Sequence, residues 1–224
     1  MKFIKLSLAA AVLATGMLAS EVAESSEIGI SANMAITSNY VWRGMTQSTD
    51  SVAIQGGVDL DFKGVYIGVW GSNVNFTDGV EAHDYSLEAD LYAGYANEIS
   101  GFSYDVGYTQ FMYPNDTEAL NFGEAHIKLG YDFKVVSVEA AYYLGVETDT
   151  IDPTDAWELS ASAPLPMEFS VDTTYGDYDE IGAYYLVGLN KSFGKFDFTI
   201  AYTAMDHDNA DTEDNFIATV GTSF

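Results

Sequence analysis

The sequence of 224 residues has no cysteine, only four prolines and three histidines, and few basic residues. Without cysteine, the chain can form neither a disulfide scaffold nor a lipid anchor on an amino-terminal cysteine. Eight Lys and Arg against 34 Asp and Glu give a formal net charge of −26, whereas phosphate contacts require a basic surface. Nucleic acid is therefore excluded as a partner. Phosphate loops, thiolate clusters and paired-histidine motifs are also missing, so no cofactor is expected.

Long apolar runs are scarce as well, and none is long enough for a membrane-spanning helix. The one near the start, from residue 6 to residue 18, follows Lys2 and Lys5 and is typical of the central part of a secretory signal. We predict a signal peptide at residues 1–20, a short periplasmic segment at 21–27 and a single domain at 28–224. This domain shows no internal boundary, solenoid-type repeat or low-complexity tract.

What the sequence does contain is a two-residue alternation of apolar side chains in twelve segments between Ile28 and Phe224. Such alternation predicts β-strands with one apolar face. Tight turns and longer loops alternate between the segments, as in outer-membrane barrels with short turns in the periplasm. The last segment ends on an aromatic residue, and we expect the barrel assembly machinery to recognise this strand. Its apolar face carries Phe216, Ala218, Val220, Thr222 and Phe224.

Three tight turns, those that follow Phe62, Phe133 and Phe193, test this interpretation. Residues that face each other across a two-residue turn must project to the same side of the sheet. In all three hairpins this rule pairs polar-face positions with polar-face positions, so the two faces stay in register. The predicted pairs are Asp61 with Tyr66, Asp132 with Ser137, and Asn190 with Thr199.

The composition of the two faces indicates which one looks outward. A soluble sandwich would expose polar faces of mixed charge, but here the polar faces are rich in Gly, Ser, Ala and Asp and nearly lack basic residues. Aromatic residues, including Trp42, Trp157 and Tyr175, gather at the segment ends, as lipid interfaces favour. We therefore predict an all-β chain that forms a single transmembrane, antiparallel, up-and-down β-barrel of about twelve strands. It would lie in the outer membrane, in contact with lipids and lipopolysaccharide; the alternative is a secreted soluble β-protein.

One stretch of the sequence is similar to a known family. Residues 38–48 read SNYVWRGMTQS, and GGVDLDF at 56–62 and GVYIGVWGSNV at 64–74 follow. This stretch resembles the TorF family of porins, most densely over residues 28–76. The resemblance implies an outer-membrane barrel with porin function, and it carries over neither a substrate nor catalytic residues.

The inward-facing side chains carry the functional prediction. In the predicted register, inward carboxylates far outnumber inward basic residues, and an acidic wall attracts cations and repels anions. We predict a porin or small diffusion channel that passes small cationic or neutral solutes and has no enzymatic activity. The candidate pore-lining residues are Arg43, Asp59, Glu88, Asp90, Lys128, Glu139 and Asp172.

Several alternatives stay open. The barrel could be plugged, or it could be a non-conducting surface barrel whose acidic loops bind divalent cations, lipopolysaccharide or a partner. In the last loop Asp206, Asp208 and Asp211 offer oxygen ligands for a metal ion. They are weak metal candidates, because the loop lacks the glycine and the glutamate spacing of an EF-hand. Arg43, at the outer rim, either orients an anionic group at the mouth or pairs with loop acids and holds the first loop. His126 is interpreted as a residue of the barrel wall.

Overall fold

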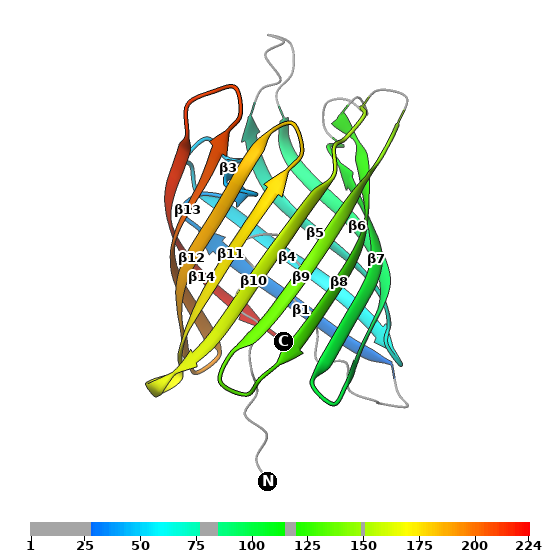
Figure 1. Cartoon of the computed structure of the whole chain (residues 1–224), viewed down its shortest axis with the longest axis vertical. Coiled ribbons are helices and arrows are strands. Elements are labelled where there is room, and N and C mark those ends of the chain that lie inside the picture. Colours follow the sequence, from blue (N-terminus) through cyan, green and yellow to red (C-terminus); the bar gives the residue numbers. More distant parts are fainter. Residues whose placement is uncertain (1–27, 77–84, 115–119, 149–150) are drawn as a thin grey trace.

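The strands form a closed, antiparallel barrel of twelve strands, in which β1 closes the ring by pairing with β14 (Figure 1). This closed ring confirms the predicted fold class. The computed structural model describes residues 28–76, 85–114, 120–148 and 151–224. The predicted signal peptide and periplasmic segment, residues 1–27, lie outside the described residues. Within the described residues no helix has the length and apolar character needed to cross a membrane.

The barrel strands run almost without interruption around the ring. They are β1 (Gly29–Thr37), β4 (Ala53–Phe62), β5 (Val65–Phe76), β6 (Tyr85–Ile99), β7 (Phe102–Met112), β8 (Phe122–Asp132), β9 (Ser137–Val146), β10 (Ala156–Leu165), β11 (Phe169–Tyr178), β12 (Gly182–Phe193), β13 (Phe196–His207) and β14 (Glu213–Ser223). The remaining elements are a small hairpin, β2 (Val41–Trp42) with β3 (Met45–Thr46), and a 3-10 helix, η3 (Pro166–Glu168).

Alternation along each strand divides the wall into an apolar outer face and a mostly polar inner face. In β13, for example, Phe198 and Ile200 are exposed, whereas their neighbours Thr199 and Ala201 are buried. The same holds around the ring, since the large exposed side chains are overwhelmingly apolar and the buried polar ones lie between them. The outer surface is therefore the kind that lipid covers, and the polar groups are enclosed.

The predicted register is confirmed at all three test hairpins. The structure pairs Asp61 with Tyr66, Asp132 with Ser137, and Asn190 with Thr199. The turn after β4 uses Lys63 and Gly64 at φ values of 52° and 89°. Positive φ at both central residues is the conformation that matches the twist of a two-residue hairpin.

Strand β1 and strand β14 form the seam that closes the ring. Their ladder consists of five residue pairs, from Asn33 opposite Ser223 to Thr37 opposite Thr219. Beyond these pairs, the backbone of Phe224 exchanges two hydrogen bonds with Ala32, at 2.9 and 3.3 Å. The C-terminus therefore lies toward the end of the barrel that carries the short turns (Figure 1).

One segment differs from the prediction. The alternation of Met167, Phe169 and Val171 predicts a strand from Met167 onward with Glu168 facing inward, but residues 166–168 form η3 and β11 begins at Phe169. Pro166 opens this turn, and both Met167 and Glu168 have positive φ, which a strand cannot accommodate. The side chain of Glu168 is consequently 75% exposed at the rim, where it pairs with Lys191.

Candidate functional site

The first loop, residues 38–52 between β1 and β4, folds inward and places the hairpin β2–β3 inside the loop end of the barrel (Figure 1). Val41 pairs with Thr46 and Trp42 with Met45. Arg43 and Gly44 form the turn at φ values of 49° and 82°. A Cβ atom on Gly44 would lie 2.6 Å from the carbonyl oxygen of Ala204. Glycine is thus required where the hairpin tip touches β13.

Contacts with several strands hold this inserted hairpin, residues 41–46, in place. Val41 packs in a buried cluster with three wall residues, Leu186, Ala201 and Ile217. The backbone N–H of Thr46 donates a hydrogen bond of 2.6 Å to the carboxylate of Glu213. The hairpin therefore has both an apolar anchor and a polar anchor on the wall.

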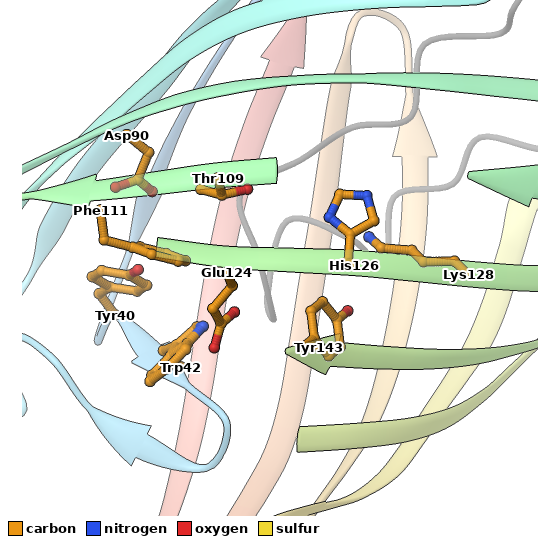
Figure 2. Close-up of a pocket in the computed structure, with 9 residues that line it drawn as sticks. All are labelled: Tyr40, Trp42, Asp90, Thr109, Phe111, Glu124, His126, Lys128 and Tyr143. Carbon is orange, nitrogen blue, oxygen red and sulfur yellow. The ribbon is translucent and has the colours of Figure 1, made fainter. Parts of the chain in front are cut away.

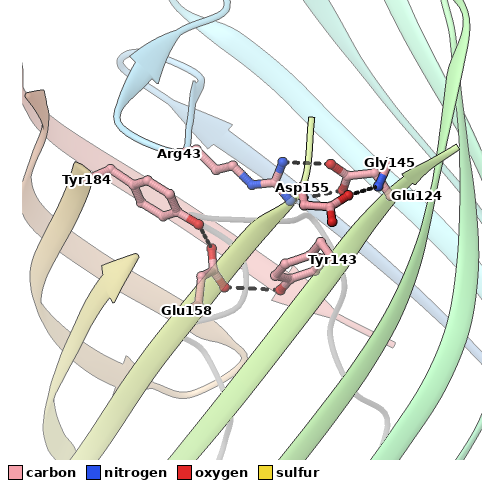
Figure 3. Close-up of polar contacts among 7 residues, drawn as sticks. All are labelled: Arg43, Glu124, Tyr143, Gly145, Asp155, Glu158 and Tyr184. Atoms are coloured by element: carbon pink, nitrogen blue, oxygen red, sulfur yellow. Dashed lines mark hydrogen bonds and ion pairs between the residues drawn. The ribbon is translucent and has the colours of Figure 1, made fainter. Parts of the chain in front are cut away.

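Arg43 forms a buried, two-pronged ion pair with Glu124 on β8 (Figure 3). Its Nη1 lies 2.6 Å from Oε1 and its Nη2 lies 2.9 Å from Oε2. The two side chains are only 1% and 4% exposed. We expected Arg43 to end the first strand at the outer rim and there either to orient an anionic group at the mouth or to pair with loop acids. Instead β1 ends at Thr37, and the inserted hairpin carries Arg43 to a carboxylate of the wall.

Three aromatic rings surround the guanidinium of Arg43. Its Cζ atom lies 4.3 Å from the ring centroid of Trp42 and 4.8 Å from those of Tyr143 and Tyr178, all within the range of cation–π attraction. Burial is the largest single influence and would lower the pKa of Arg43, but the charge and hydrogen bonds of Glu124, together with the nearby charge of Glu158, outweigh it and the pKa lies above its usual range. The predicted place of Trp42 in an outer aromatic girdle is wrong, because its ring lies inside against Phe111, Phe122 and Tyr178.

Tyrosine hydroxyls hold several of the inward carboxylates. Tyr143 and Tyr184 both donate to Glu158, at 3.0 and 2.9 Å (Figure 3). Tyr40 and Tyr113 both donate to Glu88, at 2.7 and 3.0 Å. The same arrangement joins Tyr66 to Asp105 and Tyr92 to Asp59. Sequence reasoning did not identify these tyrosine partners, although strand parity places those on the strands on the inward face.

Asp90 differs from these carboxylates. Its side chain is buried, and its Oδ1 atom has no hydrogen-bond partner in the described structure. It lines a cavity of about 10 Å³, roughly the space of one water molecule. Figure 2 shows Asp90 beside Thr109 at one end of the site, with His126 and Lys128 at the other end.

The two halves of the lumen differ in how much water reaches their acids. Toward the loops, Glu88, Asp90, Glu124 and Glu158 are all buried. Toward the short turns, burial is mixed: Asp59 and Asp172 are buried. Other inward carboxylates there are half-buried, among them Asp61, Asp105, Glu139 and Asp197. The four acids near the inserted hairpin are thus all buried, whereas half-buried inward acids occur toward the short turns.

The structure places the candidate pore-lining residues inside the barrel. Asp59 and Asp172 are buried, with Tyr92 and Asn190 as their hydrogen-bond donors. Glu139 is half-buried. Lys128 is also half-buried, and its Nζ atom lies 5.7 Å from the centroid of the Tyr143 ring. Arg43, Glu88 and Asp90 lie buried toward the loop end. That these residues line a conducting pore stays a prediction.

The weak metal candidates lie on the surface, whereas the histidine of the barrel wall is buried. Asp206, Asp208 and Asp211 are exposed, and Asp206 accepts a hydrogen bond of 2.9 Å from Thr212. In the part of the chain that the structure describes, no three His, Cys, Asp or Glu side chains are grouped to hold a metal ion. His126 is buried, and its Nε2 lies 3.3 Å from Asp105.

A closed barrel of this size with a polar interior defines a porin-like β-barrel. The barrel is similar to a KdgM porin, with a TM-score of 0.59 and 10% identity over 87% of this chain and 98% of that one. It is similar to a NanC porin, with a TM-score of 0.59 and 12% identity over 88% and 99% of the two chains. A KdgM porin in complex with disordered oligogalacturonate gives 0.56 and 9% over 87% and 97%. At these identities the likeness shows the fold.

The chain belongs to the Gcw_chp family, described as bacterial proteins of unknown function, and the match covers residues 21–224. This match does not confirm the TorF family name, which was expected from the resemblance over residues 38–74. No curated protein matches the sequence.

Proposed function

We propose that the protein is an outer-membrane porin, a narrow diffusion channel with an acidic lumen that passes small cationic or neutral solutes. The observation that carries this proposal is the division of the wall, with exposed apolar side chains outside and carboxylates inside. This arrangement lets a barrel span a lipid membrane and enclose water. Its likeness in fold to KdgM and NanC porins supports the same conclusion.

The charge of the interior supports cations as the favoured solutes. The half-buried carboxylates at the short-turn end face water, and Lys128 is the half-buried basic side chain among them. Fixed negative charges in a narrow, low-dielectric tube concentrate cations and repel anions. Oligogalacturonate, the ligand named for one KdgM porin structure, is an anionic sugar chain. The acidic wall of this chain favours a solute of the opposite charge.

Planar-bilayer recording of the purified protein under a salt gradient tests the proposal. We expect discrete channel events of small conductance with a reversal potential on the cation-selective side. A reversal potential on the anion-selective side would contradict the proposed selectivity. A barrel that folds correctly but gives no channel events would instead support the second candidate function.

That second candidate is a non-conducting surface barrel whose acidic loops bind divalent cations, lipopolysaccharide or a partner. The inserted hairpin favours it, because its buried contacts with the wall place residues 41–46 inside the loop end of the lumen. Under either function we propose that residues 1–20 direct export and that the last strand engages the barrel assembly machinery. Neither function involves a catalysed reaction.

A further inference from the structure

We infer that the wall of the lumen carries a receptor for guanidinium-type cations, and that Arg43 of the inserted hairpin occupies it from within. The inference builds on the proposed function, since it names alkylguanidinium compounds as a solute class that enters this site. Arg43 then occupies this site in place of the solute, so the first loop and the solute compete for the same site.

The wall supplies the carboxylate and two of the aromatic rings, and the loop supplies the cation and the third ring. Glu124 lies on β8, Tyr143 on β9 and Tyr178 on β11, so three strands of the rigid ring contribute. Arg43, drawn in Figure 3, and Trp42 come from the inserted hairpin. The carboxylate and two of the three aromatic rings therefore stay in position when the hairpin leaves.

The contacts are suited to a guanidinium and not to a cation in general. Glu124 accepts two parallel hydrogen bonds from the two terminal nitrogens of Arg43, the fork geometry that a planar guanidinium provides and an ammonium does not. The ring faces add cation–π attraction, which a flat, weakly hydrated cation uses well. Nε of Arg43 is buried without a partner. Recognition thus uses the two terminal nitrogens, which any monosubstituted guanidinium shares.

The charge of the wall requires a cation at this position. Glu124 is 3% exposed, and the negative charge of Glu158 also acts on the guanidinium. Without Arg43, the carboxylate of Glu124 is buried without its counter-ion, which is strongly unfavourable. A free guanidinium ion that reaches the site restores both the charge balance and the paired hydrogen bonds.

Deleting the internal cation and supplying it from solution tests the inference. The Arg43→Ala variant is recorded in planar bilayers with methylguanidinium, and with methylammonium as a cation of equal charge that lacks the fork. We expect methylguanidinium to reduce the current through Arg43→Ala at concentrations about tenfold or more below those that affect the wild type, as two charged hydrogen bonds imply. Methylammonium should show no such difference.

Two further variants make the result specific. Arg43→Lys keeps a cation on the hairpin but loses the fork, so its sensitivity to methylguanidinium should lie between those of the wild type and Arg43→Ala. Arg43→Ala/Glu124→Gln removes the receptor, so the added sensitivity should disappear. Equal sensitivity of Arg43→Ala and the wild type would overturn the inference, and so would a block that survives Glu124→Gln.

A second readout separates this inference from the proposed function. Thermal unfolding in detergent micelles measures binding without conductance, and methylguanidinium should raise the melting temperature of Arg43→Ala more than methylammonium does. If Arg43→Ala folds poorly, its folded yield in the presence of the two cations gives the same comparison. Stabilisation without channel events would reject the channel and keep the receptor, whereas channel events without selective stabilisation or block would do the reverse.

Discussion

Arg43 and Glu124 lie 81 positions apart in the sequence, and their side chains meet in a two-pronged ion pair inside the barrel, with N–O distances of 2.6 and 2.9 Å. The pair joins the turn of the inserted hairpin to the wall strand β8. It therefore helps to hold the first loop against the wall and neutralises one of the buried acids at the loop end of the lumen.

Breaking this ion pair from one side should destabilise the barrel strongly. Arg43→Met leaves the carboxylate of Glu124 buried and uncompensated, and we expect a loss of about 3–5 kcal/mol in the free energy of unfolding. The double variant Arg43→Met/Glu124→Met should lose less than Arg43→Met alone, because no buried charge remains. Urea unfolding in detergent micelles measures both values.

The exposed pair of Lys191 with Glu168 is the control for this prediction. Its side chains are 29% and 75% exposed, and Lys191→Met should cost no more than about 1 kcal/mol. A double variant that is less stable than Arg43→Met would show that the contacts of these side chains matter more than their charges.

The loss of stability caused by a charged side chain on the outer face should depend on its depth in the membrane. Val187 is 51% exposed in the middle of β12, whereas Val135 is 74% exposed in a short turn. Arg at a lipid-facing midplane position costs about 2–4 kcal/mol, and near the interface it costs about 0–1 kcal/mol. We expect Val187→Arg to lower the stability in lipid vesicles by the larger amount and Val135→Arg by the smaller one. Equal losses would contradict the lipid-facing assignment of β12.

Neutralising the accessible inner carboxylates should weaken selectivity for cations. Asp61 and Glu139 are half-buried on the inner face near the short turns. The variant Asp61→Asn/Glu139→Gln should shift the reversal potential under a salt gradient toward zero, because the wall loses two fixed charges. The matched control is Glu168→Gln, which removes an acid from the exposed rim and should leave the reversal potential unchanged. A shift of the same size in the control would assign selectivity to the rim.

A side chain on Gly44 should displace the inserted hairpin. Gly44 and Gly194 both have positive φ, 82° and 67°, but a Cβ atom on Gly194 would meet nothing within 4 Å. Gly194→Ala therefore carries only the backbone strain of about 1–2 kcal/mol. Gly44→Ala adds a collision with Ala204, and we expect it also to change the fluorescence of Trp42 and to raise the conductance. Identical behaviour of the two variants would show that the hairpin tip adapts without moving.

The register of the wall could be predicted from the sequence because a two-residue period leaves little freedom. Once a tight turn follows Phe62, the pairing of Asp61 with Tyr66 is determined, and the structure shows it. Every such prediction concerns residues that are neighbours along a hairpin, where chain connectivity supplies the constraint.

Contacts across the lumen could not be predicted in this way. Alternation places Glu124 and Arg43 on the inside, but it contains no information on which strand lies opposite which loop. The inward turn of the first loop depends on Gly44 at positive φ and on the packing of Val41 against β12, β13 and β14. Trp42 was misplaced for the same reason, since an aromatic residue next to a strand suits a lipid girdle and a loop contact equally well.

The short ladder between β1 and β14 has a consequence for how the molecule is built. Five residue pairs close the ring there, whereas β1 and β4 share nine on the opposite side of the same strand. The free edge of β1 finds its hydrogen-bond partners only in β14, so the barrel can close only after the whole polypeptide is available. The weakest junction in the wall is thus also the last to form, and it is where the structure is expected to part first under force.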